Sequence, residues 1–410
     1  MLGPGAALGL AVWLAGCGPG GDDGDGQEPA DSGEATVAPA PEGGSCDGQV
    51  GGPAYLNCLR ALARLSPLGE NADLAESAQG HAAYLVANDA TGHSQTTGLS
   101  GFTGEDPAGR ARVAGYDGFW DVAEVVAYRA DRQAALDGLL SALYHRLALL
   151  RLDAGEVGMA AAAEVEGPEA FVALTANPEM GALCGTDAYD GTGDFYRLCD
   201  PEQKVGVAEY AAARTGPMTV QPDWVKWPPD GAADIPPAFF EETPDPLPDY
   251  SVSGYPVSLQ FNPTAVGQVT VNGLRLERDG ESVPFITAMD ADSDPHGILT
   301  PRQFAWFPRE HLAWEAAYEV TADVVVDGTP RTLRWSFTTR DLPGPVYTWA
   351  PDNDRFRVPS GERVNVYLPP ASRTQQGLAW EASWPQGAKL TVAGVDQNTL
   401  ALTFPGAPGQ

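Results

Sequence analysis

Hydrophobic residues recur at helical spacing between Val50 and Leu150. Leucines at three-residue intervals, from Leu56 to Leu65, run up to Pro67, and a second apolar stripe from Leu74 to Leu85 includes His81. Ahead of this second stripe, Asp73 and Glu76 form a capping-box pattern, which predicts a helix start. A third run carries leucines along one face between Arg132 and Leu150. His81 falls on the apolar face of its helix, so we interpret it as a satisfied core residue.

Short alternating runs follow these helices. Residues 157–163 and 171–174 alternate small or apolar side chains with a period suited to strands. Helices that come first and strands that follow them predict an α+β unit, and do not predict a wound parallel sheet.

The composition and the hydrophobic pattern of the sequence change after Met180. Residues 181–218 contain two cysteines, residues 220–248 are rich in proline, and period-two alternation dominates from Pro256 onward. Asp279-Gly280 and Asp327-Gly328 lie between strand candidates, a pattern typical of tight hairpins. These features predict a β-sandwich, followed from Pro343 by a small strand-rich module.

The first 45 residues read as a targeting segment and a tether. Residues 8–15 are apolar but too short to span a bilayer, and they end in Leu14-Ala15-Gly16-Cys17. This ending resembles the lipobox of bacterial lipoproteins, which implies a lipid on Cys17, although no Lys or Arg precedes the apolar run. The alternative is an ordinary secretory signal. Residues 18–45, rich in Gly, Asp, Glu and Pro, predict a flexible acidic linker.

Charge and cysteine content are consistent with export. The 410 residues include 55 Asp and Glu against 24 Lys and Arg, for a net charge of -31. A surface of this sign repels nucleic acid and anionic membranes, so neither is an expected direct partner. Without Cys17, four cysteines remain, and we favour the pairs Cys46–Cys58 and Cys184–Cys199 because both close short loops.

Three polar residues stand out within the helical and alternating region. His93 lies in Thr-Gly-His-Ser, Glu124 in Val-Ala-Glu-Val, and His145 in Tyr-His-Arg. Two histidines and a carboxylate from three elements can hold a divalent metal, relay a proton or bind a polar headgroup. The periodicity of the third helix places His145 on the side of Asp137 and Ser141, from which it would face a cleft. Simpler alternatives are that His145 meets water and that Glu124 caps a helix.

The order of several phrases resembles the bacterial branch of the CAP superfamily, which includes cysteine-rich secretory proteins, antigen 5 and plant pathogenesis-related 1 proteins. The phrases that carry this resemblance are Tyr55-Leu56-Asn57-Cys58-Leu59-Arg60, Leu74 through Tyr84, Gly92-His93-Ser94, Phe102-Thr103-Gly104, Arg110 through Tyr116, Ala123-Glu124, Tyr144-His145-Arg146 and Glu156-Val157-Gly158.

The CAP resemblance implies a three-layer α-β-α sandwich with a central cleft lined by two histidines and acidic residues. Within it, His93 matches the first cleft histidine, Glu124 the glutamate of a Gly-Glu-Asn motif, and His145 the second histidine. Val125 departs from the family's asparagine, and the second glutamate of eukaryotic members has no match. Ser141 or Asp137 could stand in for that glutamate by helical geometry.

From about Val220 the chain resembles a bacterial Ig-like module, and the phrases that carry this resemblance are Trp227-Pro228-Pro229-Asp230-Gly231, Pro244-Asp245-Pro246, Tyr255-Pro256-Val257 and Trp335-Ser336-Phe337-Thr338-Thr339. The two resemblances and the strand pattern together imply an α+β protein: a CAP-type three-layer α-β-α sandwich, an Ig-like β-sandwich and a small C-terminal β module. The expected divisions are a lipoprotein signal peptide (1–17), an acidic linker (18–45), a CAP domain (46–180), a disulfide-containing connector (181–218), an Ig-like β-sandwich (219–341) and a C-terminal β module (342–410).

Three functions fit these expectations. In the first, an exported lipoprotein of the bacterial cell envelope, at the outer membrane or cell surface, binds a lipid or other surface ligand without turnover. In the second, His93 and His145 hold zinc, or act in acid–base catalysis with Glu124, in a hydrolase. In the third, the chain is a surface structural or adhesion module. The cleft residues would be His93, Glu124, His145 and Ser141.

Overall fold

The computed structural model describes residues 44–46, 51–165, 167–185, 191, 193–198, 203–350, 361–370, 372–374 and 390–403. The predicted signal peptide, the predicted lipidation site Cys17 and nearly all of the predicted acidic linker lie outside these residues, as does Cys199. Of the two predicted disulfides, Cys46–Cys58 is confirmed. Cys184 is also disulfide-bonded. No helix among the described residues has both the length and the apolar character needed to cross a membrane.

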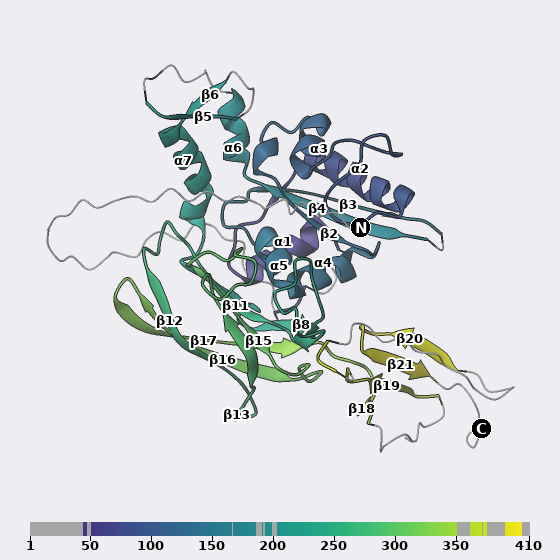
Figure 1. Cartoon of the computed structure of the whole chain (residues 1–410). Coiled ribbons are helices and arrows are strands. Elements are labelled where there is room, and N and C mark those ends of the chain that lie inside the picture. Colours follow the sequence, from purple (N-terminus) through teal and green to yellow (C-terminus); the bar gives the residue numbers. More distant parts are fainter. Residues whose placement is uncertain are drawn as a thin grey trace, which may run out of the picture. The chain divides into compact units, whose positions relative to one another are not determined.

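The amino-terminal part of the described chain is built on a four-stranded sheet in the order β1-β3-β4-β2. The strands of this sheet are β1 (Gly69–Glu70), β2 (Ala123–Ala127), β3 (Glu156–Ala163) and β4 (Glu169–Ala176). The helices around it are α1 (Pro53–Leu62), α2 (Ala72–Asn88), α3 (Pro107–Ala114), α4 (Arg132–Ser141) and α5 (Leu143–Leu149), with a 3-10 turn, η2 (Phe119–Asp121). Helices α2 and α3 cover one face of the sheet and α1, α4 and α5 the other (Figure 1). The predicted α-β-α sandwich is therefore confirmed.

Strand alternation assigns each sheet residue to one of these two layers. On β4, Val172 and Leu174 pack against α2 and α3, whereas Phe171 and Ala173 pack against α1 and α4. Successive side chains of a strand point to opposite faces, so each face of β4 has its own apolar core. The same alternation determines which polar side chains lie on the same face of the sheet and can contact one another.

Two helices differ from the expectations drawn from the sequence. Helix α2 begins after Asn71, whose side chain accepts hydrogen bonds from the Asp73 and Leu74 backbone amides, so Asn71 and not Asp73 is the cap. The stretch 132–150 is two helices, α4 and α5, which break at Ala142. Arg146 donates to the free carbonyls of Leu140 and Ser141, which stabilises this break.

A connecting region follows the sandwich. Its elements are α6 (Pro178–Ala182), η3 (Leu183–Gly185), β5 (Phe195–Arg197), β6 (Lys204–Gly206), α7 (Val207–Thr215) and η4 (Gly216–Val220). Strands β5 and β6 form an antiparallel hairpin.

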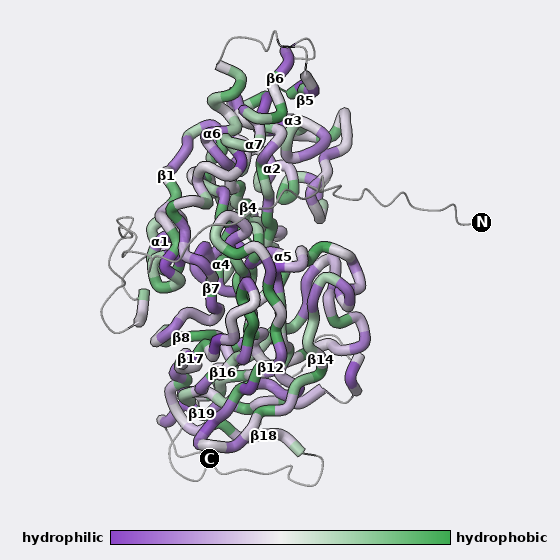
Figure 2. The backbone as a smooth tube through the Cα atoms, turned by 90° about the vertical axis from the view of Figure 1, so that its left-hand side faces the viewer, coloured by the Kyte–Doolittle hydropathy of each residue, from purple (hydrophilic) through white to green (hydrophobic). Residues whose placement is uncertain are grey.

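Two sheets form the β-rich part of the chain. The first has the order β14-β15-β11-β7 and the second β13-β12-β16-β17-β8. Their strands are β7 (Trp224–Trp227), β8 (Ala232–Ile235), β11 (Val257–Phe261), β12 (Val269–Arg278), β13 (Glu281–Ser282), β14 (Phe285–Met289), β15 (Gln303–Pro308), β16 (Ala317–Val326) and β17 (Thr329–Thr339). Apolar side chains of both sheets share one core, and hydrophobic and hydrophilic positions follow one another along the strands (Figure 2).

Smaller elements complete the β-rich part. Strands β9 (Ala238–Phe239) and β10 (Ser253–Gly254) pair with each other, and a further sheet contains β18 (Val346–Thr348), β19 (Arg363–Tyr367), β20 (Thr391–Gly394) and β21 (Thr399–Thr403). The predicted hairpins at Asp279-Gly280 and Asp327-Gly328 are confirmed, since all four residues have positive φ between paired strands.

The helical sandwich and the β-rich part are joined by a buried cation. The Arg146 side chain is fully buried and donates to the Pro256 carbonyl and the Ser258 hydroxyl, while its guanidinium lies over the rings of Trp227 and Tyr255. The Tyr255 hydroxyl in turn donates to the Leu140 carbonyl. A buried guanidinium needs acceptors for its N–H groups, and the β-rich part supplies two of them to Arg146, the Pro256 carbonyl and the Ser258 hydroxyl.

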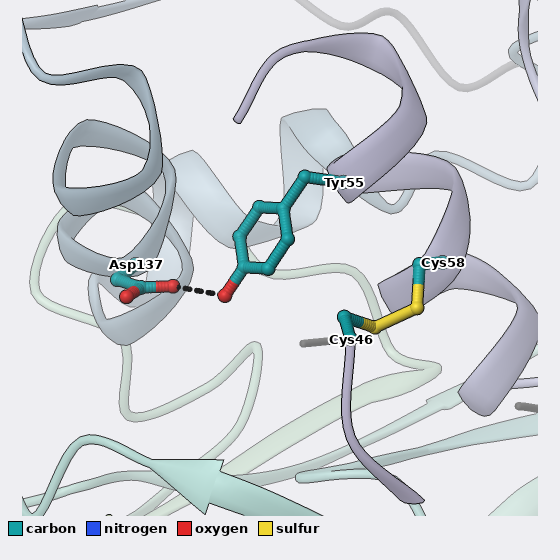
Figure 3. The surroundings of a disulfide bond; sticks show 4 residues. All are labelled: Cys46, Tyr55, Cys58 and Asp137. Carbon is teal, nitrogen blue, oxygen red and sulfur yellow. Dashed lines mark hydrogen bonds between the residues drawn. A yellow bond between two sulfur atoms is a disulfide. The ribbon is translucent and has the colours of Figure 1, made fainter. Parts of the chain in front are cut away.

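A second polar contact lies beside the Cys46–Cys58 disulfide. The Tyr55 hydroxyl donates to Asp137 at 2.6 Å (Figure 3), and the other oxygen of Asp137 accepts from Arg340 at 2.7 Å. Arg340 also pairs with Asp234. The face of the sandwich formed by α1, α4 and α5 is thus covered by residues of the β-rich part.

The packing of α2 on β3 gives a prediction about Gly158. A Cβ at this position would lie 2.2 Å from the Leu74 carbonyl carbon and the Ala75 amide nitrogen, so α2 would have to move away from the sheet. We expect Gly158→Ala to lower the free energy of unfolding by about 3 kcal/mol, measured by urea denaturation.

The matched control is Gly138→Ala, at an exposed position of α4 where a Cβ meets nothing within 4 Å. It should raise stability by up to about 1 kcal/mol, because alanine favours helix. Equal effects of the two substitutions would contradict the packing described here.

Candidate functional site

Glu124 is a buried carboxylate on the face of the sheet that α2 and α3 cover. On β2 it shares this face with Val126, and across the ladder it lies opposite Leu174. Only 1 % of its side chain is exposed. A carboxylate in such an apolar layer must be paired and hydrogen-bonded, or it would not stay ionised.

Arg110 supplies that pairing from α3. Asp106 caps this helix, and one guanidinium nitrogen of the fully buried Arg110 lies 2.8 Å from each Glu124 oxygen. Another nitrogen donates to the carbonyl oxygen of His93 at 2.9 Å. The pair therefore fixes both the carboxylate and the backbone of the loop that carries His93.

Two histidines approach the same carboxylate oxygen. His93 Nδ1 lies 3.0 Å from Glu124 Oε1, and His81 Nε2 lies 3.6 Å from it. His81 is fully buried, and its Nε2 donates to the Gly92 carbonyl at 3.0 Å while Nδ1 faces the Gln95 amide at 3.2 Å. His93 differs in having 43 % of its side chain exposed. His81 thus positions the loop, and His93 is the histidine that a ligand can reach.

The surroundings set the charge of the two buried groups. Burial alone would raise the pKa of Glu124, but the hydrogen bond from His93 and the Arg110 charge outweigh it, and the pKa is lowered. Burial lowers the pKa of His81 below its ordinary value, and Glu124 opposes this only in part. The site therefore holds an ionised carboxylate, a guanidinium and a neutral imidazole at neutral pH.

The expectation that His145 joins His93 and Glu124 is wrong. His145 Nδ1 lies 2.8 Å from an oxygen of Glu242, in the β-rich part of the chain. Ser141 donates to the Gly138 carbonyl within its own helix. Asp137 binds Tyr55 and Arg340, as described above. Neither stands in for a second cleft glutamate.

The physical reason is the layer in which each residue lies. Glu124 points to the α2 and α3 layer, whereas α5, which carries His145, lies on the opposite face of the sheet. The break at Ala142 also turns His145 away from the direction that a continuous helix would give it. Glu242 accepts from the backbone amides of Tyr144 and His145, so it holds the start of α5 as well as the imidazole.

The sequence did contain a signal for His81. It lies on the same helical stripe as Leu74, Ala78 and Leu85, and all three pack on the face of the sheet that bears Glu124. Its interpretation as a satisfied, buried residue is confirmed, but that burial places it beside Glu124. Val125, which departs from the family's asparagine, faces the core of the other layer.

The residues present do not fit the zinc site of the alternative hydrolase function, in which His93 and His145 would hold the metal. His93 and His145 have different carboxylate partners, and Arg110 already occupies both oxygens of Glu124. Within the described ranges, no group of three or more His, Cys, Asp or Glu side chains is placed to hold a metal ion.

Comparison with known proteins identifies part of the chain. The model of the cysteine-rich secretory protein family (CAP) matches residues 54–174. An outer surface protein from Borrelia burgdorferi is 21% identical, with 29% of this chain and 84% of that chain covered and a TM-score of 0.24. An extracellular protein containing a SCP domain from Bacillus anthracis is 19% identical, with 30% and 38% covered and a TM-score of 0.25. No curated protein matches the chain.

Breaking the buried ion pair should destabilise the protein strongly. We expect Arg110→Met to lower the free energy of unfolding by about 3–5 kcal/mol, because it leaves the Glu124 charge buried without its main partner. Adding Glu124→Leu to this variant should recover much of the loss. Arg112→Met, at an exposed position of the same helix, is the control and should lower stability by no more than about 1 kcal/mol, because it loses only the contact of its guanidinium with the Phe119 ring. A small effect of Arg110→Met would contradict the pairing.

The lowered pKa of His81 makes stability depend on pH. As the pH falls below the ordinary value of 6.5, the unfolded chain takes up a proton at this position before the folded chain does, so the folded state loses stability. We expect the free energy of unfolding to decrease between pH 7 and pH 5, and to decrease less in His81→Gln. Urea denaturation across this range measures both slopes, and parallel slopes would refute the contribution of His81.

Proposed function

Residues 54–174 form a domain of the cysteine-rich secretory protein family, and we propose that this domain binds a lipid or another cell-surface ligand without chemical turnover. The observation that carries the proposal is the set of contacts that the Glu124 carboxylate makes. Both its oxygens are held by Arg110 and one also by His93, so the carboxylate is not free to act as a base on a substrate.

The donor groups around the histidines also support binding over hydrolysis. In the described part of the chain, no hydroxyl or thiol hydrogen-bonds the side chain of His81 or His93. A nucleophile activated by histidine requires such a contact. What the site offers is the partly exposed imidazole of His93, held in place by Glu124, as a fixed hydrogen-bonding group.

The proposed setting is the envelope of a bacterium. The Leu-Ala-Gly-Cys17 ending supports export and lipid anchoring, and the excess of acidic residues supports a soluble body outside the cell. In this arrangement the membrane contact is made by the lipid on Cys17, and the ligand is met by the CAP domain.

The β-rich part supports the binding function from the opposite face. Its contacts through Arg146 and Arg340 cover α1, α4 and α5, and leave the α2 and α3 side, where His93 is exposed, for the ligand. We therefore interpret the β-rich part as a fixed support and not as a second binding site.

Native mass spectrometry of protein exported from a bacterial host tests this function. We expect the full chain to retain a copurified ligand, and His93→Ala to lose most of it, because His93 is the accessible residue of the site. Tyr196→Ala, at an exposed tyrosine in the β5–β6 hairpin, is the control and should retain the ligand.

A mass equal to the protein alone in the wild type, together with turnover of an ester or peptide library that Glu124→Gln abolishes, would replace the binding function with an enzymatic one.

A further inference from the structure

Tyr128 lies directly after β2 and next to the loop that carries His93. The alternation of β2 places Tyr128 on the same side as Glu124 and Val126. Its hydroxyl accepts a hydrogen bond from the Gly92 amide at 2.6 Å. The Gly92 carbonyl is in turn held by His81, so the backbone at this point is fixed from two sides. Despite this contact, 53% of Tyr128 is exposed.

The surface between Tyr128 and His93 is open. Gly92 has a positive φ of 85°, and a Cβ built on it would meet no atom within 4 Å. His93 follows it directly and is itself 43 % exposed, with Nδ1 held by Glu124. A ligand lying over Gly92 would therefore lie next to both the exposed ring of Tyr128 and the exposed part of the His93 side chain.

The charges of the site favour a neutral ligand. The carboxylate of Glu124 is cancelled by the guanidinium of Arg110, and both are buried beneath His93. The chain as a whole carries a net charge of -31, which repels anionic headgroups. A cationic ligand, conversely, finds no free carboxylate at Glu124. This surface can therefore bind a ligand through hydrogen bonds and through contact with the Tyr128 ring, and not through net charge.

These features suit one chemical class of ligand. A sugar ring has an apolar C–H face, which can lie on an exposed tyrosine ring, and hydroxyl groups at its edge, which can donate to an imidazole nitrogen. His93 Nδ1 faces Glu124, so Nε2 is the ring nitrogen left for a sugar hydroxyl, and the Tyr128 hydroxyl, which accepts from the Gly92 amide, still has its own proton to donate.

We propose that the ligand of this site is a neutral sugar ring of a cell-surface glycan, which stacks on Tyr128 and hydrogen-bonds to His93. The proposal rests on the binding function proposed above and names the class of ligand for the same site. It adds Tyr128 to the residues that contact the ligand.

Saturation-transfer difference NMR with chitotetraose and cellotetraose, on the folded full chain, tests the proposal. We expect at least one of these neutral tetrasaccharides to bind, and Tyr128→Ala to weaken the binding at least tenfold. Tyr128→Phe keeps the ring and should weaken it no more than about threefold. His93→Gln should also weaken it, whereas Tyr196→Ala, an exposed tyrosine outside the site, should leave it unchanged.

The outcomes separate this inference from the function on which it rests. If a lipid copurifies in a His93-dependent manner and neither tetrasaccharide binds, the sugar inference is overturned and the binding function stands. If tetrasaccharide binding is the same in Tyr128→Ala and the wild type, the assignment of Tyr128 is overturned. If no ligand copurifies and neither sugar binds, both proposals fail.

Discussion

The ion pair between Glu124 and Arg110 is the interaction on which the arrangement of the site depends. It buries one negative and one positive charge between the sheet and α3, and it connects three separate segments: β2, α3 and the loop that carries His93. Burial makes such a pair costly unless its geometry is good, and here both carboxylate oxygens are engaged. The accessible histidine is consequently held by groups that a ligand cannot reach.

On the opposite face of the sandwich, formed by α1, α4 and α5, a buried arginine requires hydrogen-bond acceptors from the β-rich part. Arg146 is buried with donors directed both to its own helices and to the β-rich part, so neither part alone satisfies it. Apolar residues on both sides belong to one continuous core. The histidine that the family pattern assigns to the cleft is used here at this junction, where Glu242 binds it.

Much of the fold could be predicted from the sequence, because local chemistry determines it. The helical stripe at Leu74–Leu85, the two Asp-Gly hairpins and the short disulfide loop each depend on a few neighbouring residues. The site could be predicted only in part. His93 and Glu124 do meet, but the place of His145 depends on the break at Ala142 and on Glu242, 97 residues further along the chain. Helical periodicity carries no information about either.

The Cys46–Cys58 disulfide has a mechanical consequence. It fastens Cys46 covalently to Cys58, in the middle of α1. A pulling force applied to the chain ahead of Cys46 would therefore be transmitted through the disulfide to α1. Helix α1 belongs to the helical layer that packs against the β-rich part. The face of the sheet that bears Glu124, together with the loop that carries His93, lies on the other side of the sheet from α1, so pulling on the amino terminus would leave the geometry of the site largely undisturbed.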